Sequence, residues 1–192
     1  MKNKKIYFCI TGSFCTFRQI IPIIRGLKES GNTVIPVLSF ATAKTDTRFY
    51  KASDFIKDIE EASGNKAITS IFNAEPIGPQ RDCDLLIIAP CTGNTLSKLC
   101  NAVTDTPVLM ATKAHLRNNL PVLIALSSND ALSSNMQNLG SLMAKKNIFF
   151  VPFGQDDFRN KPFSLVADYT LIEASAESAI NLKQIQPVLK QG

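Results

Sequence analysis

The sequence predicts a single α/β domain in which helices cover both faces of a parallel β-sheet. Short apolar runs of strand length recur along the chain, and segments with apolar residues at helical spacing alternate with them. Continuous apolar runs are typical of parallel strands, because such strands are buried on both faces. The length of 192 residues, without an internal repeat or linker, suits one domain with a sizeable core.

The first half of the chain begins with a buried strand, a tight turn and a helix that ends before Gly31. Pro22 lies early enough in this helix to be tolerated. Pro36 favours an edge position for the second strand. The fully apolar run before Pro90 predicts a buried strand that stops at this proline. The expected elements are strands at 6–10, 33–39, 68–72 and 85–89, helices at 17–29 and 52–62, and loops at 40–50 and 73–81.

The second half continues the alternation of helices and strands. Pro107 is a favoured first residue of a helix, and a polar segment at 127–130 follows a buried strand. The expected elements are helices from after the loop 91–94 to about 101, from 107, around 139–145 and from about 164 to 182, strands at 121–126 and 148–152, the latter being the last strand, and a loop at 154–157.

Composition narrows the class of protein. The formal net charge is +5, and the basic residues form no stripe interleaved with aromatics, so nucleic acid is not an expected partner. The five cysteines form no short metal-type pairs. Their odd number, with no recognisable signal peptide, favours a reducing cytoplasm. No apolar run approaches transmembrane length, so no membrane partner is expected.

Small polar residues follow several of the expected strands. The segments are the turn at 11–16 with Gly12, the loop at 40–50, the loop at 91–95 with Gly93, and the segment 127–130. The carboxyl ends of parallel strands share one edge of a sheet, so these segments could form one site. Glycine permits close backbone approach, and free N–H groups at a helix start suit an anion. A mononucleotide-like ligand is one interpretation; capped helices without a ligand are the other. GxGxxG is absent, so a dinucleotide fingerprint is not present.

The same segments resemble a known family. TGS after the first strand, a serine at the end of the second, and APCTGNTLSKLCNAVTDTP are similar to the homo-oligomeric flavin-containing Cys decarboxylases, whose signature PASANT corresponds here to PCTGNT. Across nearly the full chain, the match is closer to a related family, the B subunits of dipicolinate synthase. The segments that carry this resemblance are SFATAKTDTRFYKASDFIKDIEE, NAEPIGPQRDCDLLIIAPCTGNTLSKL, SSNDALSSNMQNLG and KNIFFVPFGQDD.

The resemblance implies a flavodoxin-like fold, a bound FMN and a homo-oligomer of trimers or larger. Gly12 and Ser13 would approach the phosphate, and Ser39 would lie beside the phosphate or the ribityl chain. The PCTGNT loop would face the isoalloxazine edge or the phosphate region, and 128–129 would take the place of the family's PxMN motif. The implied cofactor-binding residues are Gly12, Ser13, Phe14, Ser39, Thr42, Cys91, Thr92, Gly93, Asn94, Thr95, Ser128 and Asn129.

The resemblance also implies a reaction. The chain would act with an A subunit, similar to a nicotinamide-dependent dehydrogenase and carrying NADP, to oxidise dihydrodipicolinate to dipicolinate during spore formation. The substrate is a cyclic dicarboxylate, so Arg or Lys is expected at its carboxylates. For each candidate, a solvated surface position is the commoner alternative. The candidates are Lys44, Arg48, Lys113 and Arg117.

Two departures limit the resemblance to the decarboxylases. Their essential His has no counterpart in residues 68–81, and PxMNxxMW is reduced to the segment 127–130. His115, the only histidine, is more typical of a structural residue, although it or Asp105 could take a proton. The alternatives to an oxidoreductase subunit are therefore a non-catalytic partner with a vestigial flavin pocket and an FMN-dependent decarboxylase or flavin prenyltransferase relative.

Overall fold

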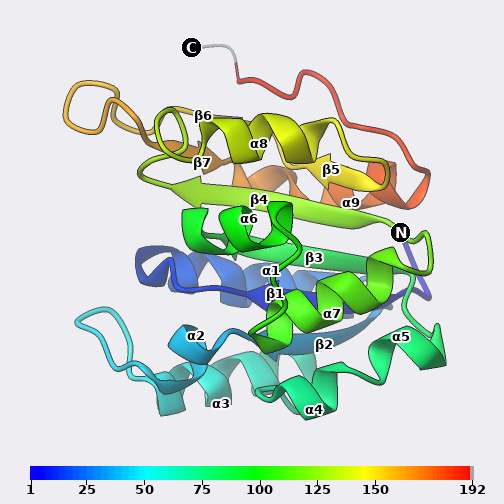
Figure 1. Cartoon of the computed structure of the whole chain (residues 1–192). Coiled ribbons are helices and arrows are strands. Elements are labelled where there is room, and N and C mark those ends of the chain that lie inside the picture. The colour runs from blue at the N-terminus through cyan, green and yellow to red at the C-terminus, as the bar shows by residue number, and fades with distance from the viewer. Residues whose placement is uncertain (191–192) are drawn as a thin grey trace.

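The computed structural model describes residues 1–190, which form a seven-stranded sheet between two layers of helices (Figure 1). The strand order is β2-β1-β3-β4, with β5 on the far side of β4, and all of these strands run parallel. The carboxyl ends of the parallel strands therefore share one edge. The strands are β1 (Lys5–Ile10), β2 (Thr33–Leu38), β3 (Leu85–Cys91), β4 (Val122–Ser128) and β5 (Ile148–Phe150).

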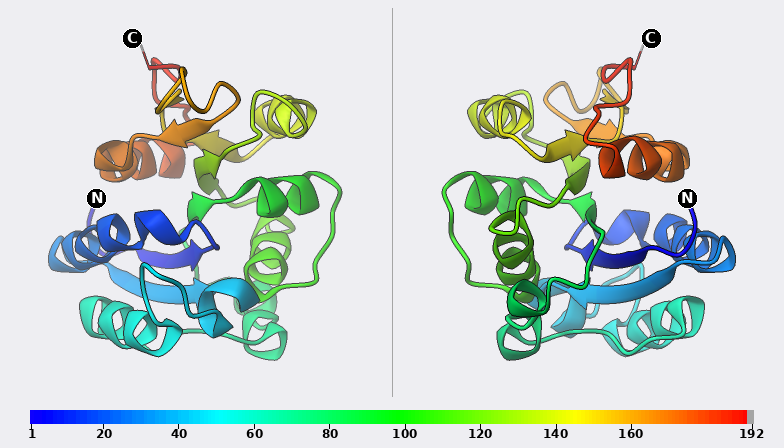
Figure 2. Two further views of the ribbon diagram at one scale, coloured as in Figure 1. Left: turned by 90° about the vertical axis from the view of Figure 1, so that its left-hand side faces the viewer. Right: turned by 90° about the vertical axis from the view of Figure 1, so that its right-hand side faces the viewer.

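Helices cover both faces of the sheet (Figure 2). On one face α1 packs against α3, where the rings of Phe17 and Phe55 stack with centroids 4.0 Å apart. On the other face α7 covers β2, β3 and β4. The first layer holds α1 (Phe17–Glu29), α3 (Ala52–Ser63) and α9 (Ile172–Ile180); the second holds α4 (Ile71–Ala74), α5 (Ile77–Gln80), α6 (Gly93–Cys100), α7 (Pro107–Leu116) and α8 (Met136–Met143).

The structure confirms the predicted α/β class and most of the predicted helices. Every residue of β3 is buried, as its continuous apolar run indicated. Pro36 lies in β2, which is the first strand of the sheet order. Gly64 ends α3 with a positive φ of 72°, and Thr106 caps α7 by accepting a hydrogen bond from the Leu109 N–H.

The prediction that the β3 strand stops at Pro90 is wrong. The strand continues through Pro90, after a cis Ala89–Pro90 peptide bond, to Cys91. Proline cannot donate to a ladder, and the pairing of β3 with β4 shifts register between Ile88 and Cys91. The Pro90 carbonyl still accepts from the Thr11 N–H at 3.3 Å, which ties the end of β3 to the turn after β1.

Two predicted loops contain helices instead. The first half of the segment 40–50 forms α2 (Phe40–Lys44), because the Ser39 hydroxyl accepts from the Thr42 N–H and caps it. The segment 73–81 contains the end of α4 and all of α5. In the predicted strand 68–72, only Ile68 pairs, in a parallel bridge with Val37.

The C-terminal part differs most from the prediction of a wholly parallel sheet. β5 pairs only with the first half of β4, so the second half of that edge is left for β7, which runs antiparallel to it. A partner there removes an exposed strand edge. Residues 127–128 therefore belong to β4, and 148–152 is not the last strand. The predicted helix 164–182 is instead β7 (Leu165–Ala167), η2 (Tyr169–Leu171) and α9, preceded by β6 (Phe153–Gly154).

Candidate functional site

A cavity of about 1470 Å³ opens at the carboxyl edge of the sheet. Its walls come from segments that are far apart in the sequence but follow the ends of neighbouring strands. Loops that carry Phe49 and Phe158 extend from this end of the molecule. The lining includes residues 12–16 after β1, 92–94 at the start of α6, 127–130 at the end of β4, 154–156 at the end of β6 and 166–170 from β7 onward.

The turn after β1 offers free backbone donors to the cavity. The Ser13 N–H bonds to the Thr11 carbonyl at 2.8 Å, and the Thr16 hydroxyl donates to the Ser13 carbonyl at 2.8 Å. The N–H groups of Phe14 and Cys15 have no acceptor among residues 1–190. They precede α1, whose N-terminal end carries partial positive charge, so this turn is suited to an anion.

The start of α6 presents a second set of donors. The Thr92 hydroxyl accepts from the Thr95 N–H at 3.4 Å and caps the helix. The N–H groups of Gly93 and Asn94 find no acceptor in the described part of the chain. The exposed Asn94 side chain also lines the cavity without a hydrogen bond to residues 1–190. An amide and free N–H groups at this position can bind the polar edge of a ring or a phosphate.

Gly93 allows α6 to approach the end of β4 closely. A Cβ atom at this position would lie 2.5 Å from Ser128 Oγ, 2.6 Å from Asp130 Oδ1 and 2.7 Å from Asn135 Nδ2. The Ser128 hydroxyl donates to Asp130, and Asn135 Nδ2 donates to the other carboxylate oxygen at 2.9 Å. The network fixes the turn after β4, against which the start of α6 packs through Gly93.

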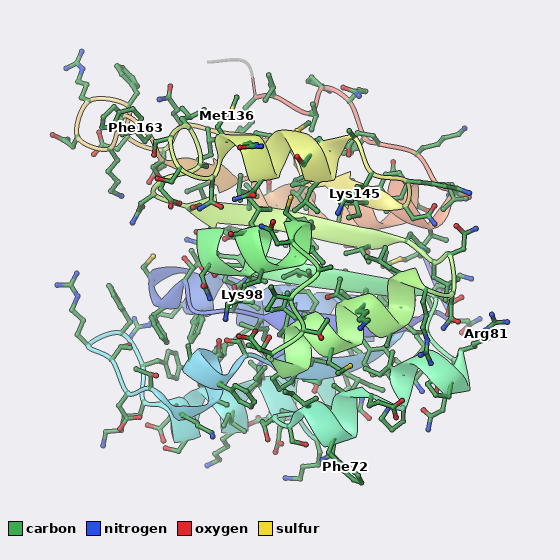
Figure 3. All side chains as sticks on the ribbon, viewed as in Figure 1. Phe72, Arg81, Lys98, Met136, Lys145 and Phe163 are labelled. Atoms are coloured by element: carbon green, nitrogen blue, oxygen red, sulfur yellow. The ribbon has the colours of Figure 1, made fainter. Side chains whose placement is uncertain are left out.

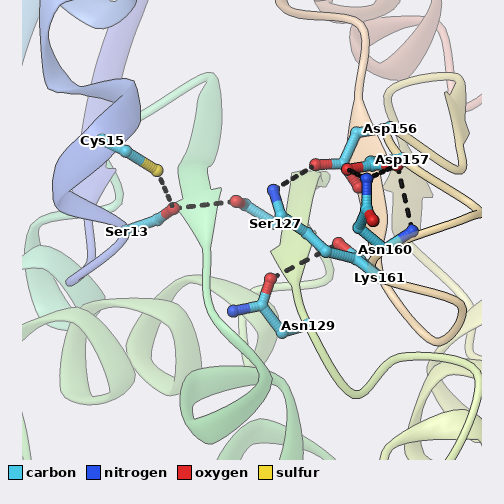
Figure 4. Close-up of polar contacts among 9 residues, drawn as sticks. Ser13, Cys15, Ser127, Asn129, Asp156, Asp157, Asn160 and Lys161 are labelled. Atoms are coloured by element: carbon cyan, nitrogen blue, oxygen red, sulfur yellow. Dashed lines mark hydrogen bonds and ion pairs between the residues drawn. The ribbon is translucent and has the colours of Figure 1, made fainter.

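The segments that follow β6 form the upper rim of the cavity and carry two ion pairs, of which Figure 4 shows that between Lys161 and Asp156. Lys161 Nζ lies 3.1 Å from Asp156, and Lys190 Nζ lies 2.8 Å from Asp168. Burial acts to raise the pKa of Asp156, but hydrogen bonds from Ser164 and Lys161 outweigh it and hold that pKa below its usual range. These carboxylates are therefore ionised and already bound to a cation near neutral pH.

The twelve predicted cofactor residues divide into two groups. Those outside the cavity lining lie directly behind it: Ser39 and Thr42 bond to each other at 2.9 Å, and Thr95 bonds to Thr92 at 3.2 Å. Buried Cys91 ends β3 next to Thr92. The structure brings Gly12, Ser13, Phe14, Thr92, Gly93, Asn94, Ser128 and Asn129 together in the lining and leaves Ser39, Thr42, Cys91 and Thr95 outside it.

The predicted cations and proton carriers mostly lie elsewhere. Of the four candidates for carboxylate binding, only Arg48 lines the cavity; Lys44, Lys113 and Arg117 do not. Asp105 pairs at 2.6 Å with Lys98, which Figure 3 labels. His115 is buried, and its Nε2 donates to the Pro121 carbonyl at 2.9 Å, away from the cavity.

Other lining residues were missed by the sequence analysis. Tyr169 and Lys161 come from the segment that follows β6, where the pattern predicted a loop and a long helix. Nothing in their local sequence indicates that this segment folds back antiparallel to β4. Ser127 lies in the polar segment at 127–130, but the family resemblance implied only Ser128 and Asn129 as cofactor-binding residues.

The sequence matches known proteins along most of its length. The model of the family described as Flavoprotein matches residues 1–174. The chain belongs to the Flavoprotein family. It is 49% identical over 189 residues to the B subunit of dipicolinate synthase from Bacillus subtilis (strain 168), covering 98% of this chain and 94% of that protein.

Solved structures with the same fold also match this chain. The crystal structure of the dipicolinate synthase B subunit from Bacillus halodurans C is 43% identical, covers 99% of this chain and 97% of its own, and has a TM-score of 0.91. The FMN-dependent cysteine decarboxylase SpaF has a TM-score of 0.67 at 17% identity, covering 93% and 97% of the two chains, so it is informative about the fold alone. The predicted flavodoxin-like fold is confirmed. Within residues 1–190, no helix has the length and apolar character needed to cross a membrane.

The close approach at Gly93 leads to a stability prediction. Gly93→Ala should lower the free energy of unfolding by about 1–3 kcal/mol, because the added methyl group overlaps Ser128 and its polar neighbours. Gly26→Ala in α1 is the control: nothing lies within 4 Å of its added Cβ, so it should stabilise by about 0.5–1 kcal/mol. Urea unfolding measures both, and equal effects at the two positions would contradict the packing argument.

Burial of His115 leads to a pH dependence. Desolvation lowers the pKa of His115 from 6.5 to about 4, despite the hydrogen bond to the Pro121 carbonyl, which raises it. Between these values the unfolded chain binds a proton that the folded chain does not, so the free energy of unfolding should fall by about 3 kcal/mol as pH drops from 7 to 4.

The variant His115→Gln isolates this contribution, since the chain has one histidine. Subtracting the urea-unfolding free energies of variant and wild type at each pH removes the contribution of the carboxylates. A difference that stays constant from pH 7 to 4 would show that His115 does not have the lowered pKa.

Proposed function

We propose that this chain is the B subunit of a dipicolinate synthase, binds FMN, and acts with an A subunit to oxidise dihydrodipicolinate to dipicolinate during spore formation. The identity of 49% to a dipicolinate synthase B subunit over almost the full length of both proteins supports the assignment. The cavity supports a ligand-binding role for the chain itself, since four backbone N–H groups in its lining have no acceptor among residues 1–190: those of Phe14, Cys15, Gly93 and Asn94.

The observation that carries the proposal is the convergence of two helix starts in one cavity. The N–H groups of Phe14 and Cys15 would hold the phosphate of FMN together with the Ser13 hydroxyl. Gly93 and Asn94 would face the ring. FMN, when bound, supplies a hydride acceptor. Ser128 and Asn129 would border the same ring at the end of β4, and Ser39, Thr42, Cys91 and Thr95 would act behind this surface by bracing the residues that touch the cofactor.

Arg48 is the residue that we propose for a substrate carboxylate. It lies at the cavity mouth, its guanidinium is 4.8 Å from the ring centre of Phe49, and it forms no ion pair within residues 1–190. A guanidinium can bind a carboxylate through two parallel hydrogen bonds. Because oxidation makes the ring aromatic, the task of the protein is to orient the ring and to provide a path for the hydride.

The proposed assembly places the nicotinamide cofactor on the partner subunit. It has no GxGxxG segment, so NADP would sit on the A subunit. We also propose a homo-oligomer of trimers or larger, as the family resemblance implies, and a place in the cytoplasm, as the cysteine usage indicates.

A second candidate is a non-catalytic partner subunit that keeps the cavity. The charged groups on its upper rim favour this alternative, because Asp156 and Asp168 are each paired with a lysine. The one histidine lies outside the cavity. Because His115 lies outside the cavity, it does not support the third alternative, a decarboxylase that uses a histidine in its site.

A reconstitution assay tests the proposal. Dihydrodipicolinate oxidation is measured with the A subunit alone, this chain alone and both together, each with and without FMN. We expect full activity only from both chains with FMN, and flavin absorbance near about 450 nm in this chain. In Asn94→Ala, FMN affinity should fall about tenfold, the effect of about one hydrogen bond, with unchanged stability.

The outcomes separate the candidates. Full activity from the A subunit alone would rule out a catalytic role for this chain. A requirement for this chain without any bound FMN would favour the non-catalytic partner.

Arg48→Gln tests the substrate contact. Loss of a charged hydrogen bond should raise the KM for dihydrodipicolinate about tenfold or more, while FMN affinity stays unchanged. Arg159→Gln is the matched control, because Arg159 also stacks on a neighbouring phenylalanine but does not line the cavity. Equal KM values for the two variants would argue against Arg48.

A further inference from the structure

Tyr169 has a buried hydroxyl group without a hydrogen-bond partner. The residue is the first of η2, lines the cavity and is 7% exposed. Its hydroxyl oxygen has no partner among the described residues. The hydroxyls of Ser127 and Thr16 lie close enough to act on the pKa of the phenol, yet neither meets the geometry of a hydrogen bond.

An unpartnered buried hydroxyl is unfavourable in a folded protein. Burial raises the pKa of Tyr169 to about 12, more than the nearby hydroxyls lower it, so the phenol keeps its proton at neutral pH. A protonated phenol can donate as well as accept a hydrogen bond. Tyr169 is therefore a hydrogen-bonding group in the cavity wall that has no partner among the described residues.

Both neighbouring hydroxyls are turned toward other partners, that of Thr16 toward the Ser13 carbonyl at 2.8 Å. The hydroxyl oxygens of Ser127 and Ser13 form a hydrogen bond of 2.8 Å, which joins the end of β4 to the turn after β1 (Figure 4). Both serines line the cavity. Rotation about the Cα–Cβ bond of Ser127 moves its hydroxyl oxygen, so a change of side-chain rotamer can change its partner.

We propose that Tyr169 is a positioning residue of the mononucleotide site: when the ligand engages the Ser13 hydroxyl, Ser127 exchanges Ser13 for the phenolic hydroxyl of Tyr169. This inference rests on the proposed function, since it needs a ligand at Ser13. In the empty site one hydroxyl, that of Tyr169, has no partner. In the occupied site Ser13 bonds to the ligand and Ser127 bonds to Tyr169, so each of these three hydroxyls has a partner. The exchange favours the occupied state.

Tyr169→Phe tests the exchange, because it removes the hydroxyl and keeps the ring. FMN affinity, measured by flavin fluorescence quenching, should fall about tenfold, since the occupied state loses one hydrogen bond. The thermal stability of the FMN-free chain should stay equal or rise, because an unpartnered hydroxyl is removed. Tyr50→Phe is the matched control: its hydroxyl bonds to Asp58 and it does not line the cavity, so FMN affinity should not change.

A double-mutant cycle tests whether Tyr169 acts through Ser127. In the Ser127→Ala background, Tyr169→Phe should have no further effect on FMN affinity, because the exchange partner is absent. Additive effects of the two substitutions would overturn the exchange. Unchanged FMN affinity in Tyr169→Phe, with a wild-type chain that binds FMN, would overturn this inference alone. A wild-type chain that binds no FMN would overturn the proposed function and this inference together.

Discussion

The complete burial of β3 is the constraint on which the rest of the structure depends. All seven of its residues are buried, and it pairs with β1 on one side and β4 on the other. A strand buried on both faces needs helices above and below, and parallel neighbours need crossovers that return to the same edge. The turns that follow β1, β3 and β4 are brought together for this reason, and the cavity lies where they meet.

Where these turns meet, glycine and small polar side chains hold the cavity walls in place. Gly93 lets α6 contact the end of β4, and the Ser128–Asp130–Asn135 network fills the space that a side chain would otherwise occupy. The Ser13–Ser127 bond then links β4 to the turn after β1. Most hydroxyls around the cavity are therefore occupied by other protein groups, while the backbone N–H groups of the two helix starts remain available for a ligand.

The sequence predicted the α/β class and the central strands because their apolar runs are continuous and need no long-range information. It predicted the turns at Gly12 and Gly93 for the same local reason, because polar and glycine residues directly follow each run. The antiparallel return of β7 could not be predicted, since it depends on the vacant second half of the β4 edge. Tyr169 follows β7, so its place in the cavity could not be predicted either.

The chemistry of the cavity differs from that of a site built around a catalytic side chain. The only histidine is buried elsewhere with a pKa lowered to about 4, and the rim carboxylates Asp156 and Asp168 are held by lysines. None of these groups is available as a general base near neutral pH. What the walls do provide is hydrogen-bond donors at fixed positions. Such a site can bind and orient a ligand that itself carries the reactive atoms.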